Sequence, residues 1–410
     1  MFGVGEFRAL FAAYLLSLIG DQLAKIAVAV LVFSHTGSAL LSAASFGIGY
    51  LPWVVGGPFL SALADRYRRR AVMVTCEGAR AALVGVLALP GIPVVVLIVV
   101  LFAAALFDPP FQSARSAILP EVLADDAYVV GQSLSRLTFQ LAQVVGYAAG
   151  GALVSVITAR GALVADAATF AVSALLLRAF VRERRSGAAA DPVSWRSEVQ
   201  EGFRLVFGDR MLRGYLLLAW AGPTAFAAPE GLMTAYAAHQ QGGPALVGVL
   251  LAAMPLGVVA GAVAYARFTP PNLRRRLILP MAFGACLELL PIWMDPPLPV
   301  VVVLLALTGY GSAYLIVLSA MFIQAVPATH RARAHGVGAT GLMIGQGAGT
   351  ALAAAAADVL GDPAAVIGLC GLIGVLLIVP IALIWPGIHP TTTPKHPETP
   401  KKGGKRRMSW

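Results

Sequence analysis

The chain has 410 residues, of which 58% are hydrophobic and 12% are charged, and its formal net charge is +10. Soluble domains carry about 25% charged residues, so this composition excludes an ordinary soluble domain and indicates a protein surrounded by lipid. The basic excess does not indicate nucleic-acid binding, because the bases lie in loops between apolar stretches. Three isolated cysteines lack metal-ligand spacing, and we expect neither a metal nor a cofactor.

Apolar stretches long enough to cross a membrane recur along the chain. A spanning helix needs about 20 mostly apolar residues. The expected helices lie at 8–33, 39–63, 71–90, 93–112, 127–156, 160–180, 212–237, 244–267, 277–294, 298–323, 331–358 and 363–386. Turn sequences such as Thr36-Gly37-Ser38 and Gly361-Asp362-Pro363 separate them. The sequence therefore predicts an all-α integral membrane protein with twelve transmembrane helices.

The basic residues outside the expected helices are distributed unevenly between the two sets of loops. They gather in alternate breaks, at 66–70, 115, 178–213, 267–276, 331–333 and 395–407. Arg160 alone falls in the opposite set of loops. Because Lys and Arg in short loops favour the cytoplasmic side, we expect a multi-pass protein of the inner (cytoplasmic) membrane with both termini in the cytoplasm. The enrichment in Arg, Ala, Gly and Val indicates a bacterial gene.

The two halves of the chain resemble each other. Four features recur in order at a shift of roughly half the chain: Leu51-Pro52 with Met254-Pro255, Arg68–Arg70 with Arg274–Arg276, Leu119-Pro120 with Val326-Pro327, and Gly131 with Gly338. Same-direction repeats of six spans are typical of one transporter architecture. We therefore expect two pseudo-symmetric six-helix bundles.

Four segments are expected on this basis. The first bundle covers 1–180 and the second covers 212–386. Between them, 181–211 forms a cytoplasmic linker whose amphipathic helix either lies on the membrane or is a plain connection. The basic tail at 387–410 is too polar to build a core, so we expect it to be disordered. It is either simply solvated or in contact with anionic lipid.

The segment Ser61-Ala62-Leu63-Ala64-Asp65-Arg66-Tyr67-Arg68-Arg69-Arg70 resembles the signature loop of the major facilitator superfamily. The loop reads glycine-x-x-x-aspartate-arginine-x-glycine-arginine-arginine in that family. The retained residues are Asp65, Arg66, Arg69 and Arg70, whereas Ser61 and Arg68 replace the two glycines. Phe107-Asp108-Pro109-Pro110 and Leu119-Pro120-Glu121 are similar to stretches of the twelve-span drug-exporter branch that includes macrolide efflux proteins.

The resemblance implies a secondary active transporter, and not an enzyme. It would export hydrophobic or amphiphilic small molecules, as in drug or antibiotic efflux, by proton antiport with alternating access between the halves. Its partners would be the small-molecule substrate, protons and membrane lipid, without nucleic acid, and we expect a monomer. Uptake or facilitated diffusion of a specific metabolite is an alternative. An intramembrane enzyme or receptor is disfavoured because clustered catalytic side chains are missing.

The resemblance also implies a role for the signature loop. Its aspartate, Asp65 here, would hold the inner gate shut by pairing across the two halves. Neighbouring Arg66, Arg69 and Arg70 can bind carboxylates through a forked guanidinium. The alternative is that these arginines only fix the orientation of the chain in the membrane.

Ionisable residues inside the expected helices are candidates for proton coupling, because charges there are costly. Glu230 is the leading candidate, since it follows Pro229 and has no base within a helical turn; the alternative is an interfacial carboxylate. Arg136 is its most plausible distant partner. Asp21 and Lys25, four residues apart, share a helix face and either neutralise each other or line a central cavity.

The remaining polar residues of the expected helices have other assignments. Glu77 and Arg80, three residues apart, are expected to form a local pair near the cytoplasmic interface. Asp166 and Glu288 are expected to be structural. A cavity for hydrophobic substrates needs aromatic and adaptable polar side chains. The candidates are Tyr14, Gln140, Gln143, Tyr310, Tyr314, Met343 and Gln346, for which packing inside the bundle is the alternative.

Overall fold

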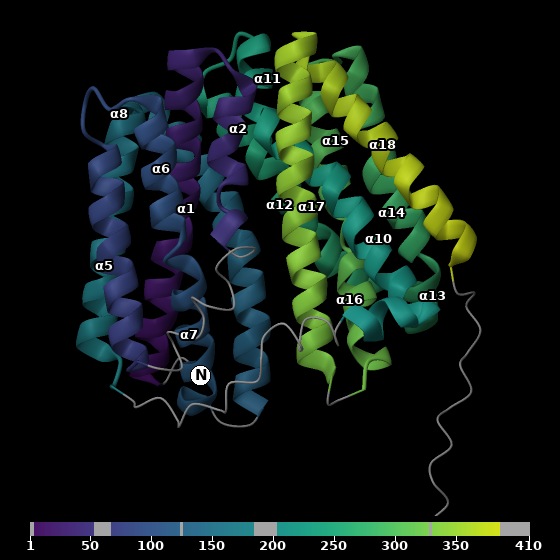
Figure 1. Cartoon of the computed structure of the whole chain (residues 1–410), viewed down its shortest axis with the longest axis horizontal. Coiled ribbons are helices and arrows are strands. Elements are labelled where there is room, and N and C mark those ends of the chain that lie inside the picture. Colours follow the sequence, from purple (N-terminus) through teal and green to yellow (C-terminus); the bar gives the residue numbers. More distant parts are fainter. Residues whose placement is uncertain (1–3, 53–66, 124–125, 184–202, 328–329, 386–410) are drawn as a thin grey trace, which may run out of the picture.

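The computed structural model describes residues 4–52, 67–123, 126–183, 203–327 and 330–385 (Figure 1). Within these ranges the regular structure is helical. Seven of the described helices are long and apolar enough to cross a membrane, judged by length and composition. The expected tail at 387–410 and most of the expected linker lie outside the described residues.

The first half contains six crossings. Its helices are α1 (Gly5–Thr36), α2 (Ala39–Gly47), α5 (Arg69–Leu87), α6 (Val94–Ala105), α7 (Asp108–Val122) and α8 (Asp126–Phe180). α6 and α7 together make one crossing, interrupted just before Pro109-Pro110. α8 makes two crossings, because the backbone breaks at Thr158 (φ 73°, ψ 160°), between the two predicted spans. α2 begins a further crossing, and residues 53–66 lie outside the described ranges.

The second half also contains six crossings. Its elements are α10 (Arg210–Ala227), η1 (Ala228–Leu232), α11 (Met233–His239), α12 (Pro244–Phe268), α13 (Pro271–Arg276), α14 (Ile278–Leu287), η2 (Leu290–Met294), α15 (Leu298–Gly311), α16 (Tyr314–Ala325), α17 (Arg331–Leu360) and α18 (Pro363–Ile384). The runs α10–η1–α11, α14–η2 and α15–α16 each form one interrupted crossing. The predicted all-α fold with twelve transmembrane helices is confirmed.

Local turn chemistry ends several helices where the sequence predicts breaks. Gly37 ends α1 with a left-handed backbone (φ 65°), and the Ser38 hydroxyl accepts a hydrogen bond from a first-turn N–H of α2. Gly361 ends α17 in the same way (φ 68°), and the Asp362 carboxylate caps the first turn of α18. Glycine adopts this conformation without steric cost, and short polar side chains satisfy free N–H groups.

Several pairs of helices join the halves, which stand side by side in Figure 1. α8 packs against α12, and α2 packs against α17. The halves approach closely between Gly151 and Gly248, where a Cβ added to Gly151 would lie 2.7 Å from the Gly248 Cα. Small residues allow such close backbone contact between membrane helices.

A carboxylate also joins the halves at the end of the bundle away from the N-terminus, which we call the distal end. Asp358, near the end of α17, accepts hydrogen bonds from the Ser38 hydroxyl (2.5 Å) and the N–H groups of Ala39 (2.5 Å) and Leu40 (3.2 Å). An anion is favourable at a helix N-terminus, here that of α2. The distal ends of the halves are therefore held together in this conformation.

The glycine contact generates a stability prediction. Gly151→Val places a branched side chain against the α12 backbone, and such overpacking costs about 1–3 kcal/mol. We expect the purified variant to unfold at a lower temperature than the wild type. Gly85→Val, on α5 where an added Cβ meets no atom within 4 Å, is the matched control. Equal melting temperatures for both variants would contradict the close α8–α12 contact.

Candidate functional site

A buried arginine is the centre of a charged cluster in the first half. The Arg80 guanidinium, on α5, donates to Asp21 and, at 3.2 Å, to the Ser17 hydroxyl, both on α1. Another pairing, at 3.6 Å, joins it to Glu77 on its own helix. Arg80 is 4% exposed and Glu77 is fully buried. An unpaired charge is costly in the interior of a membrane protein, and each charge of this cluster lies beside one of opposite sign.

Helical spacing and an aromatic ring position these groups. Ser17 and Asp21 are four residues apart on α1, and Glu77 and Arg80 are three apart on α5, so each pair shares a helix face. The Arg80 guanidinium also lies 4.3 Å from the centroid of the Phe170 ring on α8. Three helices that are distant in sequence therefore meet at one side chain.

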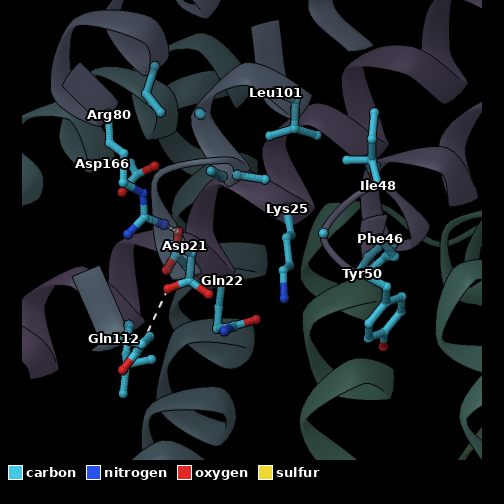
Figure 2. A pocket seen from close by; sticks show the side chains of 18 of the residues that line it. Asp21, Gln22, Lys25, Phe46, Ile48, Tyr50, Arg80, Leu101, Gln112 and Asp166 are labelled. Carbon is cyan, nitrogen blue, oxygen red and sulfur yellow. Dashed lines mark hydrogen bonds and ion pairs between the residues drawn. The ribbon is translucent and has the colours of Figure 1, made fainter. Parts of the chain in front are cut away.

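A cavity of about 490 Å³ adjoins this cluster (Figure 2). Its charged wall residues are Asp21, Lys25, Arg80, Asp108 and Asp166, and its aromatic ones are Tyr14, Phe46, Tyr50, Phe139 and Phe170. α17 of the second half contributes Ala339 and Met343. The cavity therefore lies between the halves, with most of its wall, and all of its charged wall residues, in the first half.

Two further wall carboxylates form no ion pair with the arginine among the described residues. Asp108 lies at the break between α6 and α7, where it accepts a hydrogen bond from the Gln112 amide (3.3 Å). Asp166, on α8, is fully buried, and its Oδ1 accepts from Thr169 (3.2 Å) while its Oδ2 has no partner among the described residues. A Cβ at Gly20 would lie 2.0 Å from Asp166 Oδ1, so only glycine allows this approach to α1.

Arg115 lies against Tyr14, an aromatic wall residue of the cavity. Its guanidinium is 3.4 Å from the Tyr14 ring centroid and donates to the Ser135 hydroxyl (2.8 Å). The sequence places Arg115 in a loop after the fourth span. That prediction is wrong, because α7 continues to Val122 and buries Arg115 to 6% exposure.

The two charged pairs that the sequence predicts on α1 and α5 lie at or near the cluster, but one of the ion pairs that they form differs from the prediction. Asp21 and Lys25 line the cavity, but the base that pairs with Asp21 is Arg80. Glu77 and Arg80 do contact each other, and both are buried in the bundle. Asp166, expected to be merely structural, belongs to the cavity wall.

Glu230 lies in η1, the 3₁₀ segment that interrupts its crossing after Pro229. Its carboxylate accepts a hydrogen bond from the Tyr147 hydroxyl on α8, which places this contact across the two halves. Tyr50 of the cavity wall interacts with the same carboxylate. Glu230 is not itself a wall residue of this cavity. The side chain of Arg136, its predicted partner, lies outside the described residues.

The signature-loop residues are only partly described, and Asp65 and Arg66 lie outside the described residues. Arg69 donates to Glu121 and to the Ala117 carbonyl (3.0 Å). Arg70 donates to Glu183 (3.2 Å). These contacts tie the start of α5 to α7 and to the end of α8, within the first half.

The predicted cavity residues divide into two groups. Tyr14 and Met343 line the cavity; the other five, Gln140, Gln143, Tyr310, Tyr314 and Gln346, are not among its wall residues. Tyr314 is fully buried in the second half and donates to the Leu218 carbonyl (3.3 Å). Tyr310 is 43% exposed and lies against Gly261 of α12. The Tyr314 side chain therefore serves packing within the second half in this conformation, whereas only the backbone of Tyr310 makes the close contact with α12.

Known proteins resemble this chain along most of its length. The sequence profile of the Major Facilitator Superfamily matches residues 10–289 and 272–409. A protein named multidrug efflux pump Tap from Mycolicibacterium fortuitum is 27% identical over 305 residues, covering 71% of this chain and 74% of that protein. Macrolide efflux protein A from Streptococcus pyogenes is 26% identical over 224 residues, covering 52% of this chain and 54% of that protein.

Solved structures show the same fold. A POT family transporter in complex with 5-aminolevulinic acid has a TM-score of 0.70 at 11% identity, and the alignment covers 92% of this chain and 96% of that one. The nucleoside transporter NupG has a TM-score of 0.68 at 13% identity, covering 92% of this chain and 98% of the other. At such low identity the likeness concerns the fold alone.

The charge cluster generates a second stability prediction. Arg80→Gln leaves two acids without their base, and breaking a buried ion pair costs about 3–5 kcal/mol. We expect a clear drop in melting temperature for the purified protein. Adding Glu77→Gln removes one of the stranded charges, so the double variant should regain stability. A double variant less stable than Arg80→Gln alone would contradict the pairing of Glu77 with Arg80.

Proposed function

We propose, because the chain belongs to the major facilitator superfamily, that it is a secondary active transporter that exports hydrophobic or amphiphilic small molecules from the cell. The observation that carries the proposal is the cavity between the halves, with aromatic and charged walls. Pockets of about 300–1,000 Å³ suit small-molecule ligands. Relatives named as multidrug and macrolide efflux proteins support drugs as the substrates.

Alternating access between the halves is the proposed mechanism of transport. With the termini in the cytoplasm, as the basic residues predict, the distal end faces the outside. The Asp358 contacts with the α2 N-terminus and the Gly151–Gly248 approach then close the outer side. Opening to the outside requires these contacts to break and the halves to rock apart. Asp65 and its neighbouring arginines would latch the opposite, inner side.

Exchange with protons is the proposed energy source. Asp21 and Lys25, which both line the cavity, are proposed as proton-coupling residues together with Glu230. Glu230 bridges the halves through Tyr147. Protonation of Glu230 removes its charge and weakens that charge-assisted hydrogen bond, which favours separation of the halves. Arg136 is proposed as its distant electrostatic partner.

Drug accumulation tests this function directly. We expect cells that express the protein to accumulate less of a macrolide and of cationic dyes than cells without it. An uncoupler should abolish the difference, because it removes the proton gradient. Efflux that continues in the presence of the uncoupler would overturn proton exchange.

A substitution tests the coupling residue. Glu230→Gln keeps the shape of the side chain but cannot bind and release a proton, so gradient-driven efflux should fall to near the level of cells without the protein. Glu288→Gln, a carboxylate at the end of α14 that is not a wall residue of the cavity, is the matched control and should keep efflux. Unchanged efflux by Glu230→Gln at normal expression would reject Glu230 as the coupling group.

A further inference from the structure

We propose that the cavity receives the cationic group of an amphiphilic substrate, and that Asp108 is the carboxylate that binds this group. The inference rests on the proposed export function and deepens it by naming the charge of the substrate and a residue that determines specificity. It is carried by the charge balance of the cavity wall, the partners of each carboxylate and the access to Asp108.

Carboxylates outnumber bases around the cavity. Among the described residues, the wall has three acids, Asp21, Asp108 and Asp166, and two bases, Lys25 and Arg80. The charged groups that contact the wall residues from behind leave the excess of acids over bases unchanged. Glu77 contacts Arg80 and adds one acid, whereas Arg115 stacks on the Tyr14 ring and adds one base. A surplus of negative charge in a medium of low polarity favours a bound cation.

The partners of the carboxylates separate one acid from the others. Asp21 is held by Arg80, which also binds Glu77, so the guanidinium is occupied on two sides. Neither Asp108 nor Asp166 forms an ion pair with a base among the described residues. Figure 2 shows Arg80 and Asp166 beside Asp21, with Lys25 further along the wall towards Tyr50. The surplus charge therefore falls on Asp108 and Asp166.

Asp108 is the more accessible of these two acids. It is partly exposed and lines the cavity at the break between α6 and α7. The next two residues, Pro109 and Pro110, have no backbone N–H, so the start of α7 offers the carboxylate fewer donors. Among the described residues, Asp108 accepts a hydrogen bond from the Gln112 amide at 3.3 Å. An ammonium group from a substrate would supply the missing donors and the missing charge.

Asp166 gives independent support for a cation in this place. It is fully buried in the wall, and its Oδ2 has no partner among the described residues. A buried carboxylate oxygen without a donor is costly, and a nearby bound cation would lower that cost. Phe139 and Phe170 belong to the same wall, and aromatic faces attract cations and hold an apolar body.

Two dyes of different charge test the proposal in everted membrane vesicles energised by a proton gradient. Ethidium is a permanent cation, and Nile red is an uncharged amphiphile. We expect Asp108→Asn to lower the initial rate of ethidium transport by about tenfold or more, because the variant lacks the negative charge that faces the cation, and removing one partner of a buried charge pair has an effect of this size. Nile red transport by the same variant should stay close to the wild-type rate, which also demonstrates that the variant is folded.

Two further variants complete the experiment. Asp108→Glu keeps the charge and should keep ethidium transport, and Glu288→Gln should leave both dyes unaffected. The cation site would be overturned if Asp108→Asn lowered the transport rates of both dyes equally. It would also be overturned if wild-type vesicles transported Nile red but not ethidium. In either case the export function would still stand. Wild-type vesicles that transport neither dye would overturn the export function and, with it, this inference.

Discussion

The pairing of Arg80 with Asp21 and Glu77 is the interaction on which the first half depends. A charge in the interior of a membrane protein is costly unless an opposite charge meets it. Arg80 meets this requirement by joining α1 and α5 through ion pairs and by lying over the Phe170 ring of α8. The cluster therefore fixes three helices against one another and forms one wall of the cavity.

The same constraint links the cavity to transport. Because Arg80 neutralises only part of the acidic wall, Asp108 and Asp166 need a proton or a cationic substrate to offset their charge. In the proposed exchange the bound cation offsets the charge of Asp108, while Glu230 carries the proton that drives transport. The second half supplies apolar wall residues and the contacts that must break on opening, which are Asp358 at the α2 N-terminus and Glu230 at Tyr147.

Features set by local chemistry could be predicted from the sequence. The twelve crossings follow from apolar runs, and Gly37 with Ser38 marks a helix boundary by its own backbone and capping preferences. Contacts between distant helices could not be predicted in this way. Asp21 has Lys25 four residues away but pairs with Arg80 on another helix, because side-chain direction and helix packing decide which base it meets.

A partial signal for Arg80 was present in the sequence. Glu77 and Arg80 are the only charged residues of 71–107, and a spanning helix with a single close pair indicates a buried charge cluster. Asp166 had no such signal, because its access to the cavity depends on Gly20 of α1. The sequence predicts a loop at Arg115 because the apolar run ends before it. The prediction is wrong because α7 continues as a helix past the end of that run.

Proton release on substrate binding tests the central claim most directly. Purified protein in weakly buffered detergent solution would be titrated with tetraphenylphosphonium, a permanent cation, while an indicator dye reports the pH. The account predicts that protons are released as the cation binds, and that release saturates together with binding. Saturable binding of the cation without any proton release would contradict the exchange of protons and cations at one cavity.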